Sequence, residues 1–257
     1  MLSINELNRI EFFNVIGAYH YGDIQMFTNI VYNCAIKNRF KAKIHYERQG
    51  IGIQIHKIFD YGNYVERIGK LNNLPYKFNF GKILNLGKYS KEYWCNLPFG
   101  HCSCELEPLD NFILPNCKIL KTKNEDYKCF QLDGHSPYID KPRLSNAEIQ
   151  RAIEIFHENK SYAIGNYGTK KYVKNMPVHF SNLIDQTKFI LQCKSFFGID
   201  SGMSHLCGTL KIDGDIVIQA VVKNLSDSVK KAYEFMYPTF RMHNRFILSK
   251  KCDIKIL

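Results

Sequence analysis

The stretch FFGIDSGMSHLCGTL, Phe196–Leu210, decides the fold prediction. A short apolar strand enters a Ser-Gly turn, and a helix is expected to follow at once, near Ser204. The first amides of a helix are unpaired and carry a partial positive charge, so this turn could hold a phosphate. Ser201 or Ser204 could add a hydroxyl donor, and His205 a ring N–H. From the residues alone, an ordinary turn in which Ser201 caps the helix and His205 packs is equally consistent.

The N-terminal sequence predicts a β–loop–α–β unit. Phe12–Ile16 is a short apolar run typical of a buried parallel strand, and a glycine-containing turn from Gly17 to Asp23 follows. Apolar residues then recur at helical spacing over Ile24–Cys34, and Lys43–Tyr46 has the pattern of a second strand. Such a unit implies a parallel sheet with a right-handed crossover.

The sequence after residue 126 shows the same alternation, whereas residues 47–125 give only a weak strand pattern at Lys82–Leu86. Alternating strands and helices predict an α/β fold. We expect a compact pair of Rossmann-like domains facing a cleft, residues 1–125 and 126–257. The further strands are expected at Cys129–Leu132, Ser161–Ile164, Ser195–Ile199 and Ile216–Val222. The further helices are expected at residues 149–156 after a capping box at Ser145–Glu148, at Leu183–Cys193, at residues 204–210 and at Ser228–Met236.

The composition favours an anionic partner. Lys and Arg number 35 against 24 Asp and Glu, a formal net charge of +11, which suits nucleic acid, lipopolysaccharide or phosphorylated ligands as well as plain solubility. The first residues lack a signal peptide pattern, and no apolar run reaches the roughly 20 residues of a membrane helix. We therefore expect a cytoplasmic protein without a transmembrane segment, whose nine cysteines are mostly reduced.

The stretch Tyr162–Leu210 resembles the C-terminal half of heptosyltransferase-like enzymes, glycosyltransferase family nine, which have the GT-B fold. The family pattern is a strand ending in Gly, a helix, an apolar strand and then Asp-Ser-Gly-x-x-His-Leu-Ala. Here it stands as YAIG, NLIDQTKFILQC, FFGI and DSGMSHLC, with Cys207 in place of the usual Ala. The resemblance implies a nucleotide-diphosphate sugar as co-substrate. The donor-binding residues that it implies are Asp200, Ser201, Gly202, Met203, Ser204 and His205, with Gly165, Lys141 and Arg143.

The N-terminal segment resembles the same family, whose first strand leads to Gly-Asp at the start of a helix. Gly22-Asp23-Ile24 matches that pattern, so the resemblance implies Asp23 as the catalytic base and His20, Tyr21 and Gly22 as acceptor-binding residues. A carboxylate suits the role, because sugar transfer to a hydroxyl requires removal of its proton. In the alternative interpretation, Asp23 only N-caps a helix that begins at Ile24.

Two further motifs concern cations and metals. In Asp140-Lys-Pro-Arg143, at the family's basic motif, Lys141 or Arg143 could neutralise the donor diphosphate. We find no evident Asp-x-Asp motif for a catalytic Mg²⁺ and therefore expect metal-independent, inverting transfer without a cofactor. The His101–Cys104 cluster lacks the usual spacing of a structural zinc site, and we expect free cysteines there.

Two classes of anionic acceptor are consistent with the sequence. A lipopolysaccharide-type surface glycan follows from the resemblance, and a hydroxymethylated base in phage-type DNA fits the charge. Aromatic and basic residues interleave over Tyr233–Lys251, which suits nucleic acid or, alternatively, a helix that packs its apolar side. Other candidates are a sugar-nucleotide epimerase and a non-catalytic binding module. The oligomeric state is left open.

Overall fold

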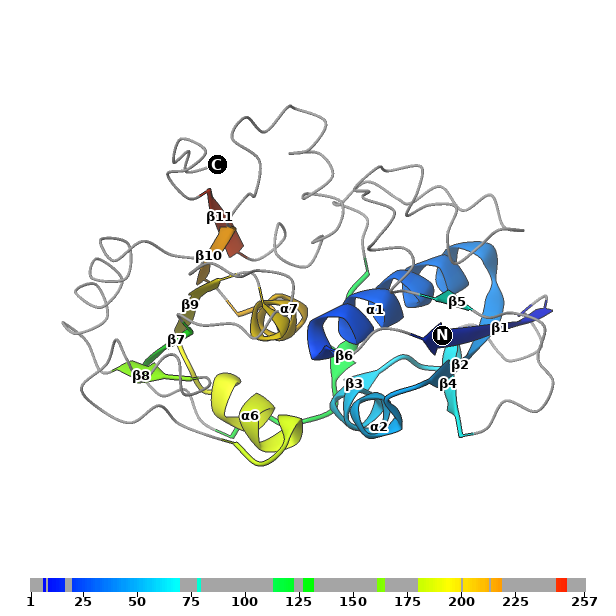
Figure 1. Ribbon diagram of the computed structural model, residues 1–257, viewed down its shortest axis with the longest axis horizontal. Helices are drawn as coiled ribbons and strands as arrows, with labels where there is room; N and C mark the ends of the chain where they lie inside the picture. The colour runs from blue at the N-terminus through cyan, green and yellow to red at the C-terminus, as the bar shows by residue number, and fades with distance from the viewer. Residues whose placement is uncertain are drawn as a thin grey trace. The chain divides into compact units, whose positions relative to one another are not determined.

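The computed structural model describes residues 7, 9–16, 20–69, 78–79, 113–122, 127–131, 161–164, 180–199, 201–212, 214–218 and 244–248. These residues form two compact units, one that ends at Lys118 and one that begins at Ile119. Each unit contains its own parallel sheet (Figure 1). The chain is thus an α/β protein, as predicted, while the domains 1–125 and 126–257 and their cleft stay predictions.

The first unit contains a four-stranded parallel sheet with the order β4-β2-β1-β5. Its strands are β1 (Arg9–Ile16), β2 (Phe40–Tyr46), β4 (Val65–Ile68) and β5 (Phe78–Asn79). The chain runs outward from β1 through β2 to β4 and then returns to the other side of β1. The strand order therefore reverses between β1 and β5, and such a switch point is where open α/β sheets bind ligands.

Two helices of the first unit pack close to this sheet. Helix α1 (Tyr21–Asn38) joins β1 to β2, and α2 (Gln49–Ile58) follows β2. The rings of Phe13 on β1 and Phe27 on α1 meet edge to face, with centroids 6.4 Å apart. After α2, β3 (Phe59–Asp60) pairs antiparallel with β6 (Asn116–Cys117). The predicted first strand, helix and second strand are confirmed.

The second unit contains a five-stranded parallel sheet with the order β11-β10-β9-β7-β8. Its strands are β7 (Lys128–Gln131), β8 (Ser161–Ala163), β9 (Ser195–Ile199), β10 (Gly214–Ile218) and β11 (Asn244–Leu248). The chain adds β8 on one side of β7 and places β9, β10 and β11 on the other. The strand order of this sheet reverses between β7 and β9, which is its switch point.

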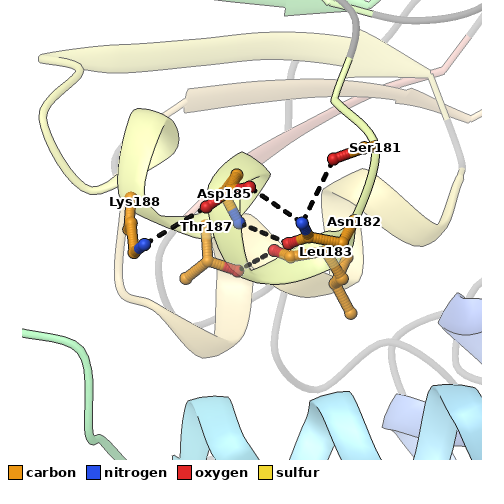
Figure 2. Close-up of polar contacts among 6 residues, drawn as sticks. All are labelled: Ser181, Asn182, Leu183, Asp185, Thr187 and Lys188. Atoms are coloured by element: carbon orange, nitrogen blue, oxygen red, sulfur yellow. Dashed lines mark hydrogen bonds and ion pairs between the residues drawn. The ribbon is translucent and has the colours of Figure 1, made fainter.

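Helix α6 (Leu183–Ile190) carries a complete side-chain cap at its N-terminus (Figure 2). Oδ1 of Asn182 accepts a hydrogen bond of 2.9 Å from the backbone N–H of Asp185, and Nδ2 of Asn182 donates to Oδ2 of Asp185 at 2.8 Å. The helix was predicted to reach Cys193 but ends at Ile190. It ends earlier because the amides of Gln192 and Cys193 bond to carbonyls three residues back, which closes a tight turn before β9.

Part of the C-terminal basic and aromatic segment is a strand and not the packed helix of one interpretation. Asn244–Leu248 forms the edge strand β11 rather than part of a packed helix, because Phe246, Ile247 and Leu248 provide the apolar run of a parallel strand. Several predicted features lie outside the described residues. They are the strand at Lys82–Leu86, the His101–Cys104 cluster, the capping box at Ser145–Glu148 and the helices at 149–156 and Ser228–Met236. Among the described helices, none has the length and hydropathy needed to cross a membrane.

Candidate functional site

The junction between β9 and α7 (Gly202–Thr209) has the strand–turn–helix form that the sequence predicted. Ser201 is the N-cap residue, with extended backbone angles of φ −155° and ψ 169°. Its carbonyl accepts bonds from the amides of Ser204 and His205 at 3.1 and 3.3 Å. The amides of Gly202 and Met203 precede these first helical bonds, so they lie at the positive end of the helix.

The side chain of Ser201 does not cap its own helix. Instead, Oγ of Ser201 donates a hydrogen bond of 2.8 Å to Oε1 of Gln131, the last residue of β7. The interpretation of Ser201 as a simple capping residue is therefore wrong for its hydroxyl. Helix α6 differs in this respect, because the side chain of its N-cap residue Asn182 bonds to the first turn of the helix (Figure 2). The first turn of α7 has no such side-chain acceptor from its own cap.

The Ser201–Gln131 pair lies at the switch point of the second sheet. β7 and β9 are neighbours in parallel register, and Gln131 stands opposite Gly198. A side chain at Gly198 would collide with the buried ring of Phe196, because an added Cβ would lie 2.6 Å from two of its atoms. The carboxyl ends of β7 and β9 thus bring a hydroxyl, an amide and a helix N-terminus together. Sequence reasoning missed Gln131, although a polar residue next to the end of the predicted strand Cys129–Leu132 was an available signal.

Helix α7 is buried along most of its length. Ser204 is fully buried, His205 is 5% exposed and Met203 is 6% exposed, whereas Ser201 and Gly202 keep partial exposure. Burial lowers the pKa of His205 to about 3, so its imidazole is neutral at neutral pH. A neutral His205 supplies a ring N–H or packing but no charge. Of the predicted donor residues on α7, Ser201 and Gly202 are therefore the ones nearest to solvent.

The start of α1 lies after β1, at the switch point of the first sheet. His20 is the N-cap residue and makes no side-chain capping bond, so the helix begins three residues before Ile24. Asp23 occupies the third helical position, which rules out its role as N-cap but suits an acidic residue near a helix N-terminus. The hydroxyl of Tyr21 donates to Oε1 of Gln25 at 3.0 Å, and Gly22 is buried.

Several predicted residues are not described. Asp200, Gly165, Lys141 and Arg143 lie outside the described residues, and Asp23 is described in its backbone alone. Their assignments stay predictions.

One Asp-x-Asp triplet does occur in the chain, contrary to the sequence-based expectation. It is Asp213-Gly214-Asp215, and Gly214 begins β10 opposite Phe196, near the amino end of β9. This edge of the sheet is opposite to the one that carries Ser201. Within the described ranges, no three His, Cys, Asp or Glu side chains are grouped so that they could hold a metal ion.

No protein-family model and no curated protein sequence matches this chain. Solved structures do. The ADP-heptose lps heptosyltransferase II of E. coli matches with a TM-score of 0.53 and 12% identity, over 92% of this chain and 90% of that chain. A family 9 glycosyl transferase from Veillonella parvula DSM 2008 matches with a TM-score of 0.52 and 12% identity, over 95% and 87%. The iron-containing dodecameric glycosyltransferase TibC from enterotoxigenic E. coli H10407 matches with a TM-score of 0.52 and 10% identity, over 83% and 59%.

These matches define the class of the fold, which this chain shares with solved glycosyltransferases, a family 9 member among them. In particular, this chain is similar in fold to a heptosyltransferase over nearly the whole length of both chains. The predicted resemblance to heptosyltransferase-like glycosyltransferases is thereby confirmed for the fold.

Proposed function

We propose that this protein is a nucleotide-sugar glycosyltransferase that binds the donor diphosphate at the switch point between β7 and β9. The observation that carries the proposal is the position of Ser201 and Gln131, joined by a hydrogen bond at the N-terminus of α7. Ligands of open parallel sheets bind outside the carboxyl ends of the strands at such a point. The fold likeness to a protein named as an ADP-heptose lps heptosyltransferase supports the same function.

The donor site would act by stabilising the leaving group. As the bond between the sugar's anomeric carbon and the diphosphate breaks, negative charge grows on the departing oxygen. The first amides of α7, at Gly202 and Met203, would meet this charge with preorganised N–H groups. Lys141 or Arg143 would add a cation, and Asp200 and Gly165 would complete the donor site. In this proposal the transfer needs no metal ion.

Asp23 would act as the catalytic base on the acceptor side. The acceptor hydroxyl attacks the anomeric carbon, a new C–O bond forms as the bond to the diphosphate breaks, and the proton passes to the Asp23 carboxylate. A single displacement of this kind inverts the anomeric configuration. The placement of Asp23 in the first turn of α1, after the carboxyl end of β1, supports this role. The facing of the two sites across a GT-B cleft is part of the same proposal.

The acceptor that we favour is a lipopolysaccharide-type glycan, with the cytoplasm as the site of transfer. The support is the fold likeness to a protein named as an lps heptosyltransferase, together with the formal net charge of +11. The phage-type DNA acceptor is tested by a gel shift with duplex DNA. Binding that weakens steeply with salt would favour DNA, and no binding at low salt would remove it.

The proposal is tested by a thermal-shift screen across nucleotide sugars and nucleoside diphosphates. A ligand that binds only the folded state at 100 times its Kd stabilises by about 2.7 kcal/mol, so a specific donor should stand out. Consumption of that donor with a glycan acceptor would then support transfer. A screen in which no nucleotide sugar raises the Tm would contradict the proposal. Release of an altered free sugar nucleotide would instead indicate an epimerase, and a bound donor that is never consumed a binding module.

A further inference from the structure

We infer that the side-chain amide of Gln131, and not the hydroxyl of Ser201, supplies the hydrogen-bond donor that recognises the diphosphate of the nucleotide sugar. The inference rests on the proposed function and deepens it, because it assigns a specificity-determining residue to the same site. It starts from the direction of one hydrogen bond, in which Oγ of Ser201 is the donor and Oε1 of Gln131 the acceptor.

The Ser201 hydroxyl has no second proton to offer. A serine side chain carries one O–H donor, and here that donor is directed at Gln131. Toward a ligand, Ser201 can therefore offer only the lone pairs of its oxygen. The oxygens of a diphosphate are acceptors as well. Contact between them would place two acceptors against each other. Ser201 therefore suits a role in orienting Gln131 better than a role in holding an anion.

The Gln131 amide has the complementary chemistry. Because its oxygen accepts from Ser201, its nitrogen lies on the other branch of the planar group with two N–H donors. Within the part of the chain that the structure describes, this nitrogen makes no hydrogen bond. Gln131 is also partly exposed, in contrast to the fully buried Ser204. A half-buried amide that is held by its oxygen and free at its nitrogen is prepared to donate to a ligand.

The position of Gln131 in the fold supports the assignment. It is the last residue of β7, its backbone stands opposite Gly198 of β9, and its side chain reaches the cap residue of α7. Gln131 thus lies on β7 and pairs with β9, the two strands that border the switch point. The missing side chain at Gly198 removes one group that would otherwise stand beside it in the register. An N–H from Gln131 would add to the amides of α7 on the same anion.

The test compares four variants by titration calorimetry with UDP, ADP and GDP. Gln131→Met removes both N–H groups at similar length, and Gln131→Glu keeps an acceptor for Ser201 but replaces the N–H groups with a carboxylate oxygen. Ser201→Ala removes the hydroxyl. Gln192→Glu is the matched control, because Gln192 lies just before the amino end of β9, away from Ser201, and donates to Thr122 there.

We expect Gln131→Met to raise the Kd of the preferred nucleoside diphosphate about 10- to 100-fold, the usual range for a hydrogen bond to a charged group. Gln131→Glu should raise it further, with a loss that shrinks as salt increases, since charge repulsion is screened. Ser201→Ala should raise the Kd less than Gln131→Met does, because it removes the group that orients the Gln131 amide but leaves both N–H donors in place. Gln192→Glu should bind as wild type does.

Two outcomes would overturn the inference alone. One is a Ser201→Ala variant that loses as much affinity as Gln131→Met, which would make the hydroxyl the donor. The other is a pair of Gln131 variants that bind as wild type does while the wild type binds a nucleoside diphosphate. If the wild type binds none of the three, the proposed function itself fails, and the inference with it. The Tm of each variant, compared with wild type, separates loss of binding from loss of folding.

Discussion

The hydroxyl of Ser201 donates a hydrogen bond of 2.8 Å to Oε1 of Gln131, and this bond joins residues that lie 70 positions apart in the chain. Ser201 follows β9 and Gln131 ends β7, so the bond spans the point where the strand order of the second sheet reverses. Two features therefore coincide there, a helix N-terminus whose cap side chain is engaged elsewhere and a polar pair at the strand ends. Their coincidence supports a phosphate site at this place.

Removal of the proposed base, Asp23, should reduce sugar transfer without weakening donor binding. We expect Asp23→Ala and Asp23→Asn to reduce transfer by at least about 10²- to 10⁴-fold, the range for a general base, while the Kd of the donor stays within about twofold. Glu66→Gln is the control, because it also removes one carboxylate from the first unit, on β4, where Glu66 pairs with Lys41. Unchanged turnover in the Asp23 variants would remove Asp23 from the mechanism.

The cap of α6 should carry measurable stability. Asn182→Ala removes the acceptor of the Asp185 amide, and we expect a loss of about 1 kcal/mol in the free energy of unfolding. Asn182→Ser keeps a capping oxygen and should lose only a few tenths. Urea unfolding of both variants at neutral pH makes the comparison. Equal stability of the Ala and Ser variants would show that the cap contributes nothing.

Two glycines of α2 should respond in opposite ways to alanine. A Cβ at Gly52 would overlap the buried ring of Tyr46, whose hydroxyl bonds to Thr28 and His56, so Gly52→Ala should destabilise by about 1–3 kcal/mol. A Cβ at Gly50 would meet nothing within 4 Å, so Gly50→Ala should stabilise by up to about 1 kcal/mol. Thermal unfolding followed by circular dichroism tests both, and a Gly52→Ala variant as stable as wild type would contradict the packing described for Tyr46.

Two buried histidines should make the protein sensitive to mild acid. Burial is the main cause that lowers the pKa of His56 to about 4, with Lys118 and Arg67 adding to it, and burial lowers that of His205 to about 3. Below pH 6.5 the unfolded chain binds protons at these residues and the folded chain does not, so stability falls as the pH falls toward 4 and 3.

The expected loss is about 2 kcal/mol for each histidine between pH 7 and pH 5, measured by urea unfolding. His205→Gln and His56→Gln should each reduce the pH-dependent loss by that amount, whatever their effect on stability at pH 7. A loss that is the same in wild type and in both variants would assign the acid sensitivity to other groups.

The sequence predicted the strands and helices that have strong apolar patterns. The strand Ser195–Ile199 and the helix that begins at Gly202 follow directly from the local sequence, because a short apolar strand and a glycine turn leave little choice of local structure. The start of α1 was misplaced because its N-cap, His20, makes no side-chain capping bond and gives no sequence signal. The strand Asn244–Leu248 was missed because basic residues surround its apolar run.

The candidate donor site was predicted only in part, for a physical reason. Ser201 and Gly202 could be predicted from the local sequence, because both belong to one turn. Gln131 joins them through the parallel pairing of β7 with β9, and the burial of Ser204 and His205 follows from the packing of α7. Neither the strand pairing nor the burial can be predicted from the spacing of nearby residues. Long-range register, rather than motif, decides which side chains reach the site.

The measurement that tests the central claim most directly is the affinity of Gly202→Asp for the nucleoside diphosphate found in the screen. A carboxylate in the first turn of α7 suits the helix but repels a phosphate bound there. Gly50→Asp is the matched control, because it places the same residue in the first turn of α2, which also has no acidic residue, in the other unit. We predict that Gly202→Asp folds and raises the Kd at least about tenfold, whereas Gly50→Asp binds as wild type does. A folded Gly202→Asp variant that binds the diphosphate as tightly as wild type would contradict the account.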